Sequence, residues 1–536
     1  MTRTRSFWGW GFTEAALSEG EVSDLGSLVS ALVDGRVTDP ARPPVIAEVR
    51  LPAGRIVAPD AIADWISADP AERAGHTYGK SFRDVVRGLA SDFGAAPDLV
   101  AFPPDEGGVT AVLDWCADAG HVVIPYGGGS SVVGGTESPP REATNGVVSL
   151  DLRHLDGVIE LDDVSRSVRV RAGTFGPALE GALRPAGFTL RHYPQSFEQS
   201  TVGGWLATRS GGHFATLQTH IDDMVESIRA ITPSGVWESR RLPGSGAGPS
   251  PDRLLLGSEG ILGVITESWL KVLPRPTFKA SGVGRFPSFS SGAQAARALA
   301  QSGLWPSNCR LLDATEAMIT GAGDGSSNLL LVAFESADHP VDAAMARAAE
   351  LVSDHGGTIA IRPSRHVDQG SEVTDESDSW RSTFLRAPYI RDALVRLGLI
   401  NETFETAITW DHFDTFVDGV LEATRDALRS VDAWPAVVTC RVTHCYPNGA
   451  APYVTVIAPG RPGARLDQWA TVKSAAMDAI DRLGGTVTHH HAVGRDHRPG
   501  YDRQRPELFA AALRAAKTEL DPSWVLNPGV LIDPVR

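Results

Sequence analysis

The sequence predicts an α+β protein with two large domains, and three observations support this prediction. The chain has 536 residues, too many for one ordinary hydrophobic core. Short strand-like runs surround glycine-rich segments in the first half, whereas strand-like and helical runs alternate in the second. We therefore expect a helical lead-in over 1–95, a first domain over 96–277, an α+β domain over 278–485 and a C-terminal segment over 486–536 that returns to the first domain.

Composition and charge restrict the classes of protein to which the chain can belong. Apolar residues make up 42% of the chain and charged residues 21%, as in folded globular proteins. Acidic side chains outnumber basic ones by 65 to 49, which gives a net charge of −16. Because binding to nucleic acid needs a basic surface and no basic stripe is present, we expect no nucleic-acid partner.

The cysteine content favours a reducing compartment, and the hydropathy of the chain argues against a membrane span or a signal peptide. Cys116, Cys309, Cys440 and Cys445 are too few and too scattered for a disulfide framework. Apolar runs fall far short of the ~18 residues that a membrane span requires. The segment Met1–Phe12 lacks the apolar core of a signal peptide. A cytoplasmic enzyme is the expectation.

Local patterns predict the elements that carry the first glycine-rich segment. Asp105 and Gly120 delimit a run whose apolar residues repeat at helical spacing, with Asp105 as the helix cap. A buried strand at Val122–Ile124 then leads directly into the glycines. Further strands are expected over 146–152, 158–161 and 168–170, followed by a helix over 177–186.

The first candidate for chemistry is the glycine loop, which consists of Pro125, Tyr126, Gly127, Gly128, Gly129, Ser130 and Ser131. Without Cβ atoms, its backbone can take positive φ and approach a ligand closely. Successive N–H groups then form a concavity that binds a pyrophosphate without any lysine. The alternative interpretation is an ordinary turn between a strand and a loop.

Other nucleotide-binding and hydrolase motifs are missing from the sequence. Val132 stands where a Rossmann fingerprint needs its third glycine. The segment Gly75–Ser81 resembles a Walker A loop but is one residue too short between its glycines. No G-x-S-x-G motif occurs, so a serine hydrolase has no support.

Two more polar, glycine-rich segments follow the glycine loop and suggest a groove for an extended cofactor. Any one of them alone would be read as a turn, but three among short strands indicate a shared site. The candidate cofactor residues are Gln195, Ser196, Thr201, Gly203, Gly204, Thr208 and Ser210 in one segment, and Glu259, Gly260, Leu262, Gly263 and Ile265 in the other.

The triplet His489, His490 and His491 is a candidate for proton transfer or anion binding, because histidine titrates near neutral pH. On a strand, only His489 and His491 would share a face. No acidic residue or cysteine stands at ligand spacing nearby, so we expect no metal site. A polar strand edge is the alternative interpretation.

Together these segments resemble the FAD-dependent flavoproteins of the vanillyl-alcohol-oxidase type, and within them the alkyldihydroxyacetonephosphate synthase family. The resemblance covers about residues 75 to 532. The matching stretches, in the family's order, are Ser200–Trp205, Asp222–Val225, Gly257–Thr266, Arg310–Asp313, Tyr389–Asp392, Glu402–Thr406, Arg441–Thr443 and His489–His491.

The resemblance implies a two-lobed FAD-binding domain, a cap domain and noncovalently bound FAD. It also implies a redox-neutral reaction, in which the acyl chain of an acyl-dihydroxyacetone phosphate is exchanged for a fatty alcohol through an adduct at flavin N5. By position, Tyr453 matches the catalytic tyrosine, Arg310 an arginine needed for activity and Arg391 the substrate-binding arginine. The triplet His489–His491 matches an active-site histidine triplet.

Residue chemistry agrees with these implied roles. A phosphate ester favours a guanidinium that binds through two hydrogen bonds, as Arg391 or Arg310 can provide. Proton transfer next to a carbonyl suits a tyrosine, and we expect cationic neighbours to lower the pKa of Tyr453. The implied partners are a lipid-like ketone phosphate and a long-chain alcohol, with a homodimer and peripheral membrane contact as further expectations.

Departures from the family leave alternatives open. The family's usual Gln-Thr-Tyr is replaced by His444, Cys445 and Tyr446, and the long targeting extension of animal members is missing. The C-terminal Asn527-Pro528-Gly529 also resembles FAD-dependent 2-hydroxyacid dehydrogenases and alcohol oxidases of the same fold, which are the alternative function. A flavin-binding protein without catalysis is a further alternative, but intact acid–base candidates argue against it.

Overall fold

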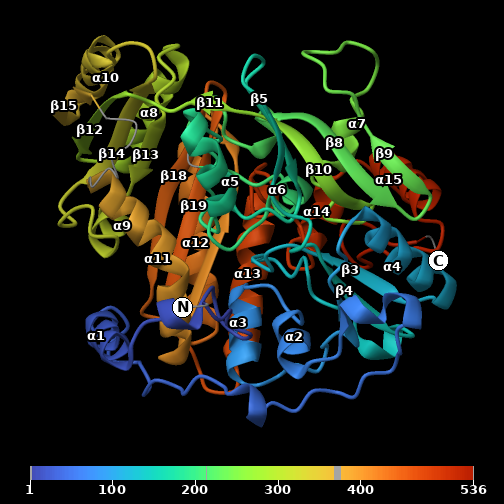
Figure 1. Cartoon of the computed structure of the whole chain (residues 1–536). Helices are drawn as coiled ribbons and strands as arrows, with labels where there is room; N and C mark the ends of the chain where they lie inside the picture. Colours follow the sequence, from blue (N-terminus) through green and yellow to red (C-terminus); the bar gives the residue numbers. More distant parts are fainter. Residues whose placement is uncertain (1–2, 213, 367–375, 535–536) are drawn as a thin grey trace.

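The structure is a computed structural model that describes residues 3–212, 214–366 and 376–534. Figure 1 shows the cap domain on the left, the two lobes of the first domain on the right and the C-terminal segment, in red, between and behind them. None of the helices in these described ranges has the length and apolar character needed to cross a membrane.

The first lobe is a four-stranded sheet that positions the glycine loop. Its order is β1 (Ile66–Ser67), β2 (Leu99–Ala101), β4 (Val147–Asp151) and β3 (Val122–Tyr126), with β2, β4 and β3 parallel. The predicted helix is confirmed as α4 (Glu106–Ala119): the Asp105 carboxylate accepts from the Gly108 N–H, and Gly120 ends the helix at φ +66°. Strand β3 then runs straight into the loop.

The second lobe is a five-stranded antiparallel sheet, and the other two glycine-rich segments lie in the connections that precede its strands β8 and β10. Its order is β5 (Val158–Asp162), β6 (Ser167–Arg171), β10 (Val264–Lys271), β8 (Val225–Thr232) and β9 (Gly235–Glu238). The helices connected to it are α5 (Gly176–Leu183), α6 (Val202–Thr208) and α7 (Pro251–Leu255), and a small sheet pairs β7 (Phe188–Thr189) with β11 (Leu273–Pro274). The predicted strands at 146–152, 158–161 and 168–170 are confirmed as β4, β5 and β6.

The cap domain is an eight-stranded antiparallel sheet with helices on both faces. Its strands are β15 (Thr358–His366), β12 (Phe278–Phe286), β14 (Asn328–Ser336), β13 (Asn308–Leu312), β18 (Val437–Tyr446), β19 (Gly449–Pro459) and β16 (Leu399–Glu405), with β17 (Ile408–Thr409) beside β19. Its helices are α8 (Phe289–Gln301), α9 (Ala314–Ile319), α10 (Asp342–Asp354), α11 (Glu376–Arg396), α12 (Phe413–Ser430) and α13 (Arg465–Arg482). Helices α8, α10, α12 and α13 cover the core face, whereas α9 and α11 border the site.

Both ends of the chain fold back onto these domains. The N-terminal part contributes α1 (Glu19–Ser30), α2 (Pro70–Gly75) and α3 (Phe82–Leu89), and both α1 and α3 pack against α11. The C-terminal segment holds α14 (Arg498–Gln504) and α15 (Glu507–Leu520). Its last residues pair with β3, because the Val123 N–H donates to the Val525 carbonyl and the Asn527 N–H donates to the Val123 carbonyl, each at 2.9 Å.

A buried lysine holds this returning segment in place. Lys517 Nζ donates to the carbonyl oxygens of Ile261 (2.6 Å) and Leu526 (2.9 Å) and to the carboxylate of Asp521, which is fully buried. The Asp521 carboxylate in turn accepts from the Val525 and Leu526 N–H groups. One ion pair therefore joins α15, the C-terminal strand partner of β3 and the third glycine-rich segment.

We expect Lys517→Met to destabilise the protein by about 3–5 kcal/mol, because it leaves the Asp521 carboxylate buried without its counter-ion. The measurement is the denaturant midpoint, compared with wild type. The control is Glu519→Gln on the exposed face of the same helix, which should leave the midpoint unchanged. Equal midpoints for Lys517→Met and Glu519→Gln would contradict the role of the ion pair.

Candidate active site

A cavity of about 700 Å³ lies between the two lobes and the cap sheet. It is lined by residues of all three glycine-rich segments, by the cavity face of the cap sheet and by the histidine loop. The predicted cofactor residues that line it are Pro125, Tyr126, Gly127, Gly128, Gly129, Ser130, Ser131, Gln195, Ser196, Thr201, Gly203, Gly204, Thr208, Ser210, Glu259, Gly260, Gly263 and Ile265. The fold therefore brings the three segments together around one space.

Leu262 is the exception among the predicted cofactor residues. It is fully buried in the hydrophobic core of the first domain and does not line the cavity. Its neighbours Gly260 and Gly263 do line the cavity. The side chain of Leu262 therefore belongs to the core, and its assignment to cofactor binding stays a prediction.

The glycine loop has the geometry of an anion-binding concavity. Gly129 has φ +64°, and a Cβ at Gly128 would lie 1.8 Å from the carbonyl oxygen of Gln199. The N–H groups of Gly128, Gly129, Ser130 and Ser131 make no hydrogen bond within the described residues. These four donors at one end of a long cavity fit a pyrophosphate, so the residues present fit FAD.

Strand alternation places the catalytic candidates on the cavity face of the cap sheet. Along β13 and β18, Leu311 and Val442 face the core, while Arg310 and Arg441 line the cavity. Arg441 is the cross-strand partner of Tyr453 on β19, and its guanidinium carbon lies 3.8 Å from the centre of the Tyr453 ring. The sheet thus fixes the tyrosine beneath a cation.

The pKa of Tyr453 differs from the sequence expectation. Burial raises it above the ordinary value of a tyrosine, and the positive charge of Arg441 offsets only part of this rise. The cationic neighbour therefore acts in the predicted direction, but the larger effect of burial makes the net shift of the Tyr453 pKa upward. Because Arg441 is itself paired with the buried Glu316 carboxylate, its charge is partly neutralised. Tyr453 is accordingly protonated at neutral pH.

The two other predicted arginines occupy different parts of the cavity wall. Arg310 is buried beside Arg441, and burial together with that neighbouring charge lowers its pKa to about 9. Arg391, on α11, donates to the Lys80 carbonyl and to the Asp392 carboxylate, the latter at 2.8 Å. Arg310 therefore lies on the same face of the cap sheet as Tyr453, whereas Arg391 lies next to the N-terminal part of the chain.

The histidine triplet lies in a loop, and the alternative of a polar strand edge is wrong. The N–H groups of His489 (2.6 Å), His490 (3.1 Å) and His491 (2.9 Å) all donate to the carboxylate of Glu405 at the end of β16. This single acceptor curls the backbone, so the three rings do not alternate as they would on a strand. His490 and His491 line the cavity, while His489 is enclosed by Tyr446, His220 and His444.

Burial keeps these histidines neutral. It lowers the pKa of His490 to about 3 and lowers the pKa of His489 and His491 as well, even though the Glu405 carboxylate opposes the shift. The pKa of Glu405 is held well below its usual range by its interactions with the histidine loop, including the hydrogen bond from the Thr488 hydroxyl. The loop therefore presents neutral imidazoles, which accept protons, next to the protonated Tyr453.

Sequence reasoning missed several residues of this site. Glu405 and Glu316 anchor the histidine loop and Arg441, and His444 packs on His489 with ring centroids 4.9 Å apart. The role of each of these residues becomes apparent only in the folded structure, because its partner is distant in the sequence. The one available signal was at position 444, where the sequence departs from the family pattern.

Comparisons with known proteins agree with this geometry. The family described as "FAD binding domain" matches residues 97–239, and the family described as "FAD linked oxidases, C-terminal domain" matches residues 275–531. An alkyldihydroxyacetonephosphate synthase of Dictyostelium discoideum is 28% identical over 89% of this chain and 80% of its own length. One of Caenorhabditis elegans is 29% identical over 85% of this chain and 79% of its own. A solved structure of such a synthase superposes with a TM-score of 0.80 at 25% identity, covering 98% of each chain.

Fold, cavity and family matches together define a FAD-dependent flavoenzyme of the FAD-linked oxidase class, and they confirm the predicted vanillyl-alcohol-oxidase-type fold and FAD as the cofactor. Within that class, the chain is a homologue of the alkyldihydroxyacetonephosphate synthases.

We expect Gly128→Val to abolish retention of FAD, because its side chain would collide with the backbone at Gln199 and Ser200 and displace the loop. The measurement is the ratio of flavin to protein absorbance after purification. Gly181→Ala in α5, where an added Cβ meets nothing within 4 Å, is the matched control and should purify yellow. A yellow Gly128→Val protein would contradict the assignment of the loop.

Proposed function

We propose that this flavoenzyme exchanges the acyl chain of an acyl-dihydroxyacetone phosphate for a long-chain alcohol and so forms an ether lipid precursor. One observation carries the proposal. A single cavity connects an anion-binding glycine loop, a cluster of tyrosine, histidine and arginine side chains, and an apolar arm. The glycine loop would hold the cofactor, while the arginines of the cluster and the apolar arm match a substrate that has a phosphate at one end and a hydrocarbon chain at the other.

The apolar arm is formed where α1, α9 and α11 meet. Its lining includes Leu25, Val29, Leu32, Ile319, Ile390 and Leu394. Leu28 and Met318 belong to the same lining and are 70% and 44% exposed, so the arm leads toward the surface. A hydrocarbon chain gains about 0.8 kcal/mol per buried CH₂, so an arm of this kind favours long-chain alcohols over short ones.

The charged end of the cavity suits a phosphate ester. Arg310 and Arg441 line the cavity on neighbouring strands, and Arg310 is almost completely buried. Buried guanidinium groups are stabilised when a phosphate binds, and their planar geometry matches phosphate oxygens. Both arginines lie on the same sheet face as Tyr453, so the ketone carbon next to the phosphate would be held near the tyrosine.

The residues of the chain divide the proton transfers between them. FAD, when bound, supplies the reactive centre at which one substituent of the substrate carbon is replaced by the other. Tyr453 is protonated and donates, while the neutral imidazoles of His490 and His491 accept; their ring centroids lie 6.3 Å and 5.6 Å from that of Tyr453. The carboxylate leaves as the fatty acid and the alkoxy oxygen takes its place, so no electrons are gained or lost overall.

The deciding assay incubates the FAD-loaded protein with palmitoyl-dihydroxyacetone phosphate and radiolabelled hexadecanol. We expect an alkyl-dihydroxyacetone phosphate that carries the label and one equivalent of released palmitate, without any electron acceptor. A parallel assay offers D-lactate with an artificial electron acceptor. Flavin bleaching by the hydroxy acid, together with no labelled ether, would favour the dehydrogenase alternative and overturn the proposal.

We expect Tyr453→Phe to lower the rate of exchange by about 10²–10⁴ while leaving FAD content and stability near wild type. The substitution keeps the ring, its packing and its contact with Arg441, and removes only the phenol oxygen. The measurement is the rate of label incorporation at saturating substrate. Turnover within about threefold of wild type, well inside that expected loss, would remove Tyr453 from the mechanism.

We expect FAD to be bound noncovalently, because the glycine loop contains neither histidine nor cysteine as a tether. Acid precipitation should leave the yellow colour in the supernatant. A yellow pellet would indicate a covalent bond and direct attention to His192 and His220; His213, a third candidate, lies outside the described residues.

Peripheral membrane contact is a further part of the proposal. Support comes from Leu28 and Met318 at the exposed end of the apolar arm, because long-chain substrates are held in membranes. The cytoplasmic location and the homodimer stay predictions.

A further inference from the structure

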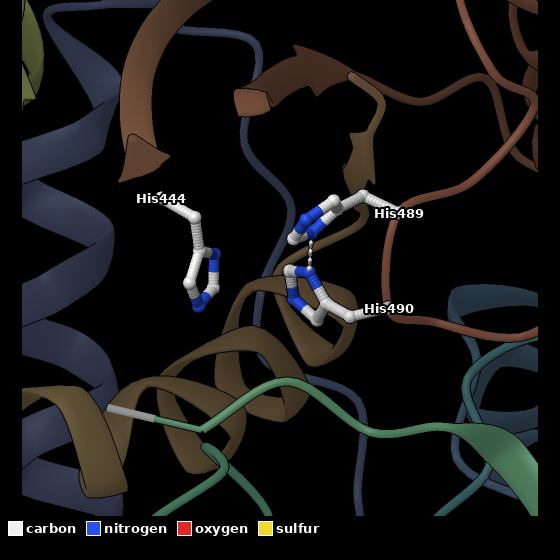
Figure 2. Close-up of side chains that lie close together, drawn as sticks. All are labelled: His444, His489 and His490. Atoms are coloured by element: carbon white, nitrogen blue, oxygen red, sulfur yellow. Dashed lines mark hydrogen bonds between the residues drawn. The ribbon is translucent and has the colours of Figure 1, made fainter. Parts of the chain in front are cut away.

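Three histidines from two distant parts of the chain meet at the inner end of the cavity. His444 comes from β18, and His489 and His490 come from the loop held by Glu405. One ring nitrogen of each lies within 4.8 Å of one ring nitrogen of both others. Figure 2 shows the ring of His444 facing the other two rings, with the hydrogen bond between His489 and His490 drawn as a dashed line.

For His444 and His489, hydrogen bonds to residues outside the cluster determine which ring nitrogen carries the lone pair. His444 Nε2 lies 3.2 Å from the Gly212 carbonyl oxygen, which only accepts, so Nε2 carries the proton. Nδ1 then carries the lone pair and accepts from the Thr443 hydroxyl 3.1 Å away, a hydrogen bond that a bound metal ion would replace. The Tyr446 hydroxyl donates to Thr219, so His489 Nε2, at 2.7 Å, donates to the Tyr446 oxygen. The lone pair of His489 is therefore on Nδ1, the atom that faces His490.

The nitrogens of His489 and His490 already have a spacing close to that of metal ligands, whereas the His444 nitrogen lies within 4.8 Å of them and moves closer when an ion binds. The Nδ1 atoms of His489 and His490 are 3.0 Å apart. Two imidazole nitrogens bound to one tetrahedral zinc ion, each at about 2.0–2.1 Å, are separated by about 3.3 Å. A shift of a few tenths of an ångström therefore converts the hydrogen-bonded pair into a ligand pair, provided that His490 is protonated on Nε2.

We propose that His444, His489 and His490 form a binding site for one divalent metal ion of the kind that prefers imidazole ligands, such as zinc or cobalt. Three neutral imidazoles leave a fourth coordination position open toward the cavity. The Glu405 carboxylate lies 3.5 Å from His490 Nδ1 and 4.0 Å from His489 Nδ1, where its negative charge stabilises the ion without binding it. The earlier expectation that the triplet has no acidic partner fails because Glu405 is distant in sequence.

This proposal goes beyond the exchange reaction and does not depend on it. The donor set is complete without substrate, so metal binding can be measured whether or not the protein makes ether lipids. Binding would occupy the lone pairs of His489 and His490, leaving proton acceptance to His491. The third ligand, His444, stands where the family pattern of the sequence has glutamine, so the site is expected to depend on a residue that distinguishes this chain.

The test uses the tag-free, FAD-loaded protein after treatment with EDTA, titrated with Zn²⁺ alone by isothermal calorimetry. We expect one ion per chain, and we expect His444→Gln to weaken binding by more than about 100-fold, beyond the usual loss for an outer-shell partner. The control is His412→Gln, whose side chain is 67% exposed on the cap domain, and its affinity should equal that of wild type. Absence of stoichiometric binding to wild type, or equal affinity for His444→Gln, would overturn the proposal.

A second measurement covers the case in which His444→Gln fails to fold. Wild type titrated with Co²⁺ should develop d–d absorption at wavelengths beyond the flavin bands, with the intensity of a four-coordinate site. Added Zn²⁺ should abolish this absorption at one equivalent. Weak absorption typical of six-coordinate, water-rich cobalt would show that the three histidines do not bind the ion together and would equally overturn the proposal.

Discussion

The carboxylate of Glu405 is the interaction on which the candidate active site depends. It is completely buried at the end of β16, and an ionised carboxylate in such a place is stable only with several hydrogen bonds. Three consecutive N–H groups, of residues 489–491, and the Thr488 hydroxyl provide them. The acid therefore determines the conformation of the histidine loop, ties the C-terminal segment to the cap domain and places His490 and His491 in the cavity wall.

A second buried acid holds the next part of the same segment to the first domain. Glu259 accepts from the Val493 and Gly494 N–H groups, each at 2.8 Å, and its burial raises its pKa to about 7. The two acids thus differ in their surroundings: several hydrogen bonds from the histidine loop keep Glu405 ionised, whereas burial dominates at Glu259 and raises its pKa. Together, Glu259 and Glu405 explain why a segment near the end of the chain packs against both domains and forms part of the active-site wall.

How far the sequence predicts this structure depends on the distance between the interacting residues. Helix α4, strand β3 and the glycine loop were predicted closely, because Asp105, Gly120 and the loop glycines act on their immediate neighbours. The alternative of a polar strand edge for the histidine triplet is wrong, since the conformation of this loop is set by a carboxylate more than 80 residues earlier in the chain. Tyr453 came only from the family resemblance: β19 is buried on both faces, so no alternation of polar and apolar residues marks its cavity side.

Burial determines the protonation states at this site, because it raises the pKa of an acid such as a phenol and lowers the pKa of a base such as an imidazole. Taking a group out of water favours its neutral form, which keeps the proton on the Tyr453 phenol and off the imidazoles of His490 and His491. Arg441 reinforces the second effect, because its positive charge also lowers the pKa of both histidines. The same arrangement thus leaves the tyrosine protonated and the imidazoles neutral, which are the protonation states that the proposed donor and acceptor roles require, and it leaves imidazole lone pairs for the proposed metal ion.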